Sequence, residues 1–224
     1  MSIEIKLCSS DGHSLSAFFS AVPKKAKGSV IILHAIYGRT QHMSDICDRW
    51  ADAGYNAIAP ALYDRIKPNL VFNYDKKGQN LGRISYGKLD ENCILLDIDA
   101  AIKHFKPNNK IIISGFCTGG TWAWIGAAKL SFFASINFYG SHIPSKMDIK
   151  PRCPTILHYG DKDLVVPIHD VKKIKNTFPE FSVYVYPKAG HAFFNPEQEN
   201  YNKSAADLAW ERSRKFLDKL VAQK

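Results

Sequence analysis

The segment Ser29–His34 (SVIILH) is a continuous, mostly apolar run rich in β-branched residues, and it constrains the fold more than any other feature. Such runs are typical of strands buried on both faces of a parallel sheet. Further short apolar segments follow it, and segments of helical periodicity lie between them. This alternation predicts an α/β fold with a doubly wound, mostly parallel sheet, flanked by helices and joined by right-handed crossovers.

The predicted elements extend over nearly the whole chain. The strands are Ser2–Leu7, Leu15–Ala21, Ser29–His34, Tyr55–Pro60, Lys110–Ser114, Phe132–Phe138, Thr155–Tyr159 and Ser182–Tyr186. The helices are 44–53, a stretch with Ile94, Ile98, Ile102 and Phe105 on one face that ends before Pro107, a helix from Thr118, 168–178, and a last helix from about Lys203. The turn dipeptide Asp11-Gly12 predicts that the first two strands are antiparallel. With 224 residues, 46% of them apolar, we expect one domain over residues 1–224.

The segment of residues 61–87 is rich in Asn, Gly, Lys and Tyr and shows no clear periodicity. It is long for a connection within a compact domain, and loops of this size often serve as lids or binding loops. We therefore expect an irregular segment that covers or binds a ligand.

A candidate nucleophile lies where the strand Lys110–Ser114 runs into Gly115-Phe116-Cys117-Thr118-Gly119-Gly120 and then into a helix. This is the G-x-Nuc-x-G pattern of a nucleophile elbow, with Cys117 at the nucleophile position. The glycines allow a tight strand-to-helix turn, and the helix N-terminus favours a thiolate over a thiol. Taken alone, the pattern is equally consistent with a glycine-rich turn around a buried, inert cysteine.

A candidate acid and base follow Cys117 in the chain order of an α/β-hydrolase triad. Asp163 comes just after the strand Thr155–Tyr159, and His191 comes after the strand Ser182–Tyr186. Functional loops of parallel sheets lie at such carboxyl ends. Asp161 is a rival acid, either aspartate could instead cap the next helix, and an isolated histidine more often has a structural role.

The segments GFCTGG, HYGDKDLVVP, AGHAFFNP and HAIYG together resemble the dienelactone hydrolase (carboxymethylenebutenolidase) family of α/β-hydrolases over nearly the whole chain. The resemblance implies that Cys117 is the nucleophile, that Asp163 rather than Asp161 is the acid, and that His191 is the base. On this interpretation an ester or lactone is hydrolysed through a covalent thioester. The backbone N–H groups of Ile36 and Thr118 would form the oxyanion hole.

The sequence departs from this family at two positions that matter for its substrate. The family has a glutamate that interacts with the resting cysteine, and here the corresponding residue is Ala35. It also binds the substrate carboxylate with two arginines, one of which corresponds to Asn195 here and the other to Arg83. We therefore do not assume dienelactone as the substrate, and the expected substrate-binding side chains are Arg83, Tyr86 and Phe193.

Composition narrows the classes of molecule that the protein is expected to bind. Lys and Arg number 30 against 21 Asp and Glu, a formal net charge of +9, which would favour an anionic substrate. These charges are dispersed and no nucleic-acid-binding motif accompanies them, so we expect no nucleic-acid partner. No apolar run reaches the ~18 residues of a membrane span, and the N-terminus lacks a long apolar signal region. We expect a cytoplasmic protein without a membrane partner, acting as a monomer or weak dimer.

Cofactors are not indicated. The five cysteines are scattered, without a CxxC or a Cys/His cluster, and there is no nucleotide-binding glycine pattern. We therefore expect neither a metal nor a cofactor. Two other classes stay open: a hydrolase scaffold with weak or lost activity that binds a small molecule, suggested by Ala35 and Asn195, and a protein that binds nucleic acid or membrane through its basic surface.

Overall fold

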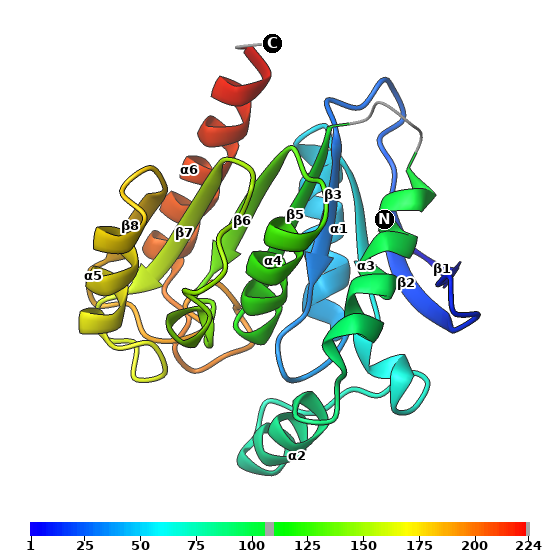
Figure 1. Cartoon of the computed structure of the whole chain (residues 1–224), viewed down its shortest axis with the longest axis horizontal. Coiled ribbons are helices and arrows are strands. Elements are labelled where there is room, and N and C mark those ends of the chain that lie inside the picture. The colour runs from blue at the N-terminus through cyan, green and yellow to red at the C-terminus, as the bar shows by residue number, and fades with distance from the viewer. Residues whose placement is uncertain (106–109, 223–224) are drawn as a thin grey trace. The chain divides into compact units, whose positions relative to one another are not determined.

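The structure is a computed structural model that describes residues 1–105 and 110–222. The chain forms two compact units, Met1–Ser114 and Gly115–Lys224 (Figure 1). The strand β5 (Ile111–Phe116) contains the boundary between them.

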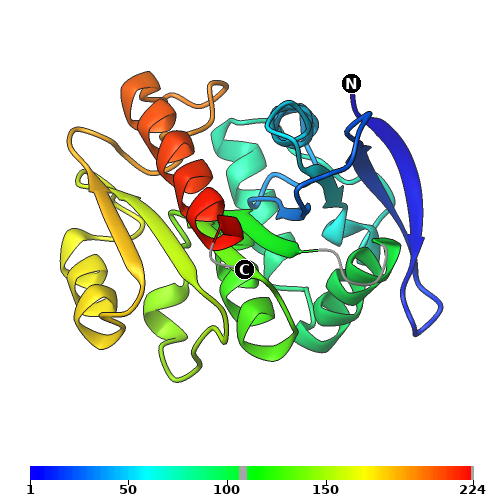
Figure 2. The same cartoon turned by 90° about the horizontal axis from the view of Figure 1, so that it is seen from above.

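The described residues of the N-terminal unit form four complete strands, three α-helices and a short 3-10 helix. They are β1 (Ile3–Cys8), β2 (Ser14–Ser20), β3 (Ser29–Leu33), α1 (Gln41–Asp52), β4 (Asn56–Pro60), η1 (Leu62–Arg65), α2 (Lys76–Tyr86) and α3 (Glu91–His104). The order along the sheet is β1-β2-β4-β3, followed by β5. β1 and β2 pair antiparallel, as do β2 and β4, whereas β3 and β4 are parallel. α1 and α3 lie on opposite faces of these strands, as Figure 2 shows, so both faces of β3 are buried, as its sequence predicts.

The C-terminal unit continues the alternation of strand and helix. It contains α4 (Thr118–Lys129), β6 (Ala134–Phe138), η2 (Ile143–Ser145), β7 (Thr155–Gly160), α5 (Ile168–Thr177), β8 (Ser182–Tyr186) and α6 (Lys203–Ala222). From the end of β5 the order is β6-β7-β8, and β6, β7 and β8 are mutually parallel. α4 and α5 lie on one face of these strands and α6 on the other (Figure 2). A sheet wound on both faces places its loops at the carboxyl ends of its strands, where a site can form.

The predicted strands and helices are present with small shifts at their ends, but the prediction of an irregular segment at 61–87 is wrong. It contains η1 and the well-formed helix α2. Asp75 caps α2 by accepting a hydrogen bond from the backbone N–H of Gly78 at 2.6 Å. At Gly78 a Cβ would lie 2.0 Å from the carbonyl oxygen of Asn73, so only glycine fits. Glycine has a low helix propensity, so the glycines of α2 weakened the sequence pattern that would have predicted this helix. Pro107 lies outside the described residues.

None of the helices in the described ranges has the length and apolar character needed to span a lipid bilayer.

A buried histidine lies within β7. His158 has no exposed surface, and its Nδ1 accepts from the Tyr186 hydroxyl at 2.7 Å. Its Nε2–H donates to Ser213 Oγ at 2.9 Å, because the Ser213 proton is already donated to the carbonyl of Ala209. Burial, with a smaller contribution from the charge of Arg212, lowers the pKa of His158 to about 3. His158 is therefore neutral in the folded protein.

This burial predicts acid sensitivity. In the unfolded chain His158 binds a proton below about pH 6.5, whereas the folded protein binds it only near pH 3. The free energy of unfolding should fall as the pH drops from about 6.5, by about 1.4 kcal/mol per pH unit for this residue. Burial also lowers the pKa values of His34 and His42 to about 4, so urea unfolding between pH 7 and 5 should show the summed slope of these histidines. His158→Gln should reduce that slope by about one proton. His169→Gln, at an exposed position, is the matched control. An unchanged slope in His158→Gln would contradict the prediction.

Candidate active site

The turn from β5 to α4 holds Cys117 in a backbone conformation that non-glycine residues rarely adopt, with φ 54° and ψ −118°. Two close approaches leave room for no side chain beside it. A Cβ at Gly115 would lie 2.1 Å from the carbonyl oxygen of Gly119, and one at Gly120 would lie 2.9 Å from Cα of Gly140. The N–H of Cys117 donates to the carbonyl of Phe138 at 3.0 Å. The turn is thus the strained strand-to-helix elbow that the sequence predicts.

The carboxylate of Asp163 is fully buried in the loop after β7, and both of its oxygens are used. Oδ1 accepts from the backbone N–H groups of Val165 and Val166 at 2.8 and 2.9 Å. Oδ2 accepts from Nδ1 of His191 at 2.8 Å. The rival aspartate, Asp161, is attached differently: its N–H donates to the carbonyl of Tyr186, and its Oδ1 has no partner among the described residues. The structure therefore brings Asp163, not Asp161, to the histidine.

His191 follows β8 and is held on two sides. Its side chain is 15% exposed, its Nδ1–H is donated to Asp163, and its ring meets that of Tyr139 edge to face with centroids 5.0 Å apart. The other ring nitrogen, Nε2, is buried and has no conventional hydrogen-bond partner in the described part of the chain. A ring held in this way leaves Nε2 available to exchange a proton with a neighbouring group.

Cys117 and His191 shift each other's protonation. Burial raises the pKa of Cys117, but the charge and hydrogen bonding of His191, the hydroxyl of Ser141 and the N–H of Thr118 outweigh it, and the net shift is downward. Burial also opposes the charge on His191, yet the negative charge of Cys117 and the hydrogen bond to Asp163 raise its pKa. Both shifts favour a thiolate beside an imidazolium.

The aromatic residues around His191 are packing elements. Phe193 has no exposed surface, and its ring lies 5.4 Å from that of Tyr139 and 5.1 Å from that of Tyr186. A ring so enclosed offers no surface to a ligand. Its position supports Tyr139, which in turn supports His191, so packing is the better interpretation of Phe193.

The residues predicted to act together are divided between the two units. Cys117, Thr118, Asp163 and His191 belong to the C-terminal unit. Ile36 (buried), Arg83 (exposed) and Tyr86 (half-buried) belong to the N-terminal unit, where Arg83 and Tyr86 lie on α2. The roles of these three residues stay predictions.

Asn195 is occupied in a local turn. It is buried, and its Oδ1 accepts from the backbone N–H of Glu197 at 3.0 Å. At the position where the family has an arginine, this chain thus has a side chain that holds its own loop.

Sequence reasoning missed Ser141, whose hydroxyl acts on the thiol of Cys117. The only sequence signal is that Ser141 follows the carboxyl end of β6.

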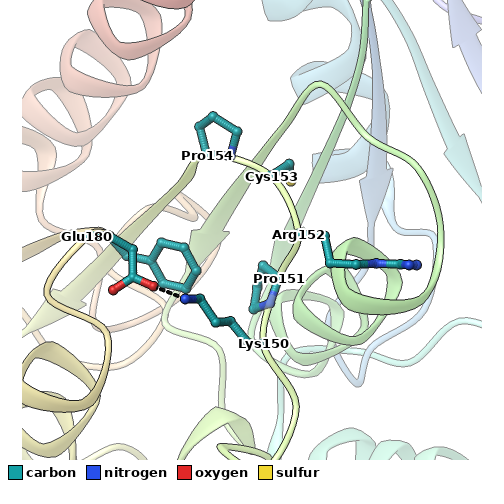
Figure 3. Close-up of a pocket in the computed structure, with 7 residues that line it drawn as sticks. Lys150, Pro151, Arg152, Cys153, Pro154 and Glu180 are labelled. Atoms are coloured by element: carbon teal, nitrogen blue, oxygen red, sulfur yellow. Dashed lines mark ion pairs between the residues drawn. The ribbon is translucent and has the colours of Figure 1, made fainter.

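An open pocket of about 610 Å³ lies elsewhere in the C-terminal unit. It is lined by Lys150, Pro151, Arg152, Cys153, Pro154, Glu180 and Phe181. Figure 3 shows Lys150 and Glu180 joined by an ion pair at this pocket. These residues precede β7 and β8, whereas Asp163 and His191 follow them, so the pocket lies at the other end of these strands from the acid and base.

Among the described residues, no group of three or more His, Cys, Asp or Glu side chains could hold a metal ion.

The strand order and the elbow at Cys117 define the class of α/β-hydrolases, and comparisons with known proteins narrow this class. The sequence model of the dienelactone hydrolase family matches residues 17–221. Carboxymethylenebutenolidases of Pseudomonas putida and Pseudomonas knackmussii are each 29% identical over 230 residues, which cover 98% of both chains. The crystal structure of a "putative dienelactone hydrolase" from Klebsiella pneumoniae is similar with a TM-score of 0.82 and 28% identity, over 97% of this chain and 99% of that one.

The chain belongs to the dienelactone hydrolase family. This membership confirms the resemblance seen in the sequence, the predicted α/β-hydrolase fold with its mostly parallel sheet, and the assignment to hydrolases of the ester and lactone class.

The contact between Asp163 and His191 gives a direct prediction. In Asp163→Asn the burial that opposes the imidazolium remains, while the negative charge that offsets part of it is lost. The pKa of His191 should therefore fall below its value in the unmodified protein, as measured by NMR titration of the imidazole Cε1–H. Asp161→Asn is the matched control and should leave this pKa unchanged. A fall in the control, or none in Asp163→Asn, would mean that Asp163 does not set the charge of His191.

Proposed function

We propose that the protein hydrolyses small carboxylic esters or lactones with Cys117 as nucleophile, His191 as acid and base, and Asp163 as the group that orients His191. The proposal rests on the arrangement around His191. Asp163 holds this residue through Nδ1 at 2.8 Å, its Nε2 is buried and has no conventional partner among the described residues, and its imidazole lowers the pKa of Cys117. The arrangement supplies a nucleophile, a base and an orienting acid, as acyl transfer requires.

In the acylation step, the thiolate of Cys117 attacks the carbonyl carbon of the substrate. The C–S bond forms as the carbonyl π electrons move onto oxygen. When the tetrahedral intermediate collapses, the bond between carbon and the alkoxy oxygen breaks. The imidazolium of His191 gives its Nε2 proton to the leaving alkoxide, and a thioester of Cys117 remains. In a lactone the alkoxide stays attached to the acyl group.

Deacylation reverses these roles. His191, now neutral, takes a proton from a water molecule as that water attacks the thioester carbonyl. The second tetrahedral intermediate expels the thiolate, so the C–S bond breaks and the acid product leaves. The thiolate and the imidazolium are restored. Asp163 stabilises the imidazolium in both steps and keeps the proton on Nδ1, which leaves Nε2 as the reactive nitrogen.

The oxyanion of both intermediates needs backbone donors. Thr118 is the first residue of α4, and its N–H already contributes to stabilising charge on Cys117. The removal of one such donor typically lowers kcat by about 10²–10³. We assign Thr118 N–H as one donor, and Ile36 stays the predicted second donor.

The substrate is expected to be a small molecule, and the formal charge of +9 favours an anionic one. Because Asn195 holds a turn, a carboxylate of the substrate would depend on Arg83, on α2, rather than on a pair of arginines. Tyr86 on the same helix is the proposed neighbour of that contact. A monomer or weak dimer and a cytoplasmic location remain predictions.

Hydrolysis of short p-nitrophenyl esters and of a small lactone panel tests the proposal. Cys117→Ala and His191→Ala should each lose about 10³-fold or more in kcat, because the members of a triad act as a unit. Asp163→Asn should lose about 10²–10⁴-fold, and Asp161→Asn should stay near the unmodified rate. Mass spectrometry after rapid acid quench should detect an acyl adduct on Cys117. Full activity in Cys117→Ala would refute the mechanism, and no turnover of any substrate would favour the small-molecule binding scaffold.

A further inference from the structure

Ser141 lies directly beside the nucleophile although it follows a different strand. Its backbone N–H donates to the carbonyl oxygen of Cys117 at 3.2 Å, three residues beyond β6. The N–H of Cys117 in turn donates to the carbonyl of Phe138, the last residue of β6. The two hydrogen bonds fix residues 138–141 and the elbow to each other.

Two glycines hold this contact at short range. A Cβ at Gly120, in the first turn of α4, would lie 2.9 Å from Cα of Gly140. A Cβ at Gly140 would lie 3.3 Å from the carbonyl carbon of Gly120 and 2.4 Å from Cδ1 of Ile143. The backbones therefore touch, and the residue after Gly140 is held at the nucleophile without freedom to swing away.

Two buried polar atoms around Cys117 lack a conventional partner within the described residues. They are Oγ of Ser141 and Nε2 of His191. A buried hydroxyl without a partner is uncommon in a folded protein and calls for an explanation. Both atoms belong to side chains that act on the same thiol, so a negatively charged sulfur would satisfy both of them.

We propose that Ser141 is a catalytic residue of the hydrolysis described under Proposed function, on which this inference rests: its hydroxyl donates a hydrogen bond to the sulfur of Cys117 whenever that sulfur is negatively charged. A serine hydroxyl can rotate to donate or stay idle, which suits a group needed in only part of the cycle.

The electrostatics of the site support this role. The Ser141 hydroxyl is among the groups that lower the pKa of Cys117 against the effect of burial. The charged group that acts on Cys117 within the described part of its unit is His191, with the carboxylate of Asp163 behind it. Tyr139 also packs against His191, through its ring. Ser141 is the neutral side-chain donor among the groups around Cys117. Its effect on the pKa of Cys117 can therefore be measured separately from that of the charged His191.

The hydrogen bond from the Ser141 hydroxyl to Cys117 has its greatest effect on deacylation. In the thioester the sulfur is neutral and Ser141 has no charge to stabilise. When the second tetrahedral intermediate breaks its C–S bond, the electron pair returns to sulfur, and the Ser141 hydroxyl stabilises the departing thiolate. In acylation a larger thiolate fraction is partly offset by the lower nucleophilicity of a more acidic thiol. Loss of the hydroxyl should therefore slow deacylation more than acylation.

The experiment compares Ser141→Ala, Ser141→Thr and Ser141→Val with the unmodified protein. Ser145→Ala is the control, at an exposed serine that ends η2. Alkylation of Cys117 by iodoacetamide is followed against pH by mass spectrometry of its peptide, which separates it from the other four cysteines. Hydrolysis of p-nitrophenyl acetate is followed from the first milliseconds. Thr and Val have the same shape and differ in the hydroxyl alone, so this pair isolates the hydrogen bond even if Ala disturbs packing.

In Ser141→Ala and Ser141→Val the apparent pKa of Cys117 should rise by about 1–2 units, because a hydrogen bond to a charged group shifts such an equilibrium by about that much. Steady-state hydrolysis should fall about tenfold or more with a burst of p-nitrophenol equal to the enzyme concentration. Ser141→Thr and Ser145→Ala should retain the original pKa.

An unchanged pKa of Cys117 in both Ala and Val variants would overturn the assignment of Ser141, whether or not hydrolysis depends on Cys117. Equal loss in Ser141→Thr and Ser141→Val would also overturn it, since packing would then be the cause. If Cys117→Ala retains hydrolysis, the proposed function fails, and the alkylation titration still decides whether Ser141 stabilises the thiolate.

Discussion

The backbone strain at Cys117 is the constraint on which the rest of the candidate site depends. A cysteine at φ 54° would relax to a common conformation unless its neighbours prevented it. Gly115 and Gly120 allow backbones to approach too closely for any side chain, and the hydrogen bond to Phe138 attaches the turn to the adjacent strand. The sulfur is thereby held at the start of α4, where the partial positive charge of a helix N-terminus and the N–H of Thr118 favour its ionised form.

The acid and base are oriented by hydrogen bonds and packing contacts of their own loops. Asp163 is oriented by two backbone N–H groups of its own loop, so its remaining oxygen has one direction in which to accept. His191 comes from the loop after the neighbouring parallel strand, and Tyr139 supports its ring from the side. A short parallel arrangement of strands thus delivers three loops to one edge, and each loop needs only a few hydrogen bonds to aim its side chain.

The sequence predicted the strands and the three candidate residues because their signals are strong and local. Apolar β-branched runs mark buried strands, and the glycines around Cys117 mark the elbow. Helix α2 was missed because Gly78 and Gly82 interrupt any apolar stripe, and the helix depends on the Asp75 cap and on close backbone contact instead. Ser141 was missed because a serine after a strand has no distinctive pattern. Its significance lies in a contact between residues far apart in the chain, which spacing does not encode.

The lowered pKa of Cys117 also bears on oxidation. Thiolates are the form of cysteine that peroxide attacks most readily, first to a sulfenic acid, which a nearby second thiol can convert to a reversible disulfide. The other cysteine of the C-terminal unit, Cys153, is buried before β7 begins, whereas Cys117 follows β5 at its carboxyl end, and burial raises the pKa of Cys153 to about 11. Within this unit the reactive sulfur therefore has no resolving partner. The features that prepare Cys117 for acyl transfer therefore also favour its oxidation by peroxide.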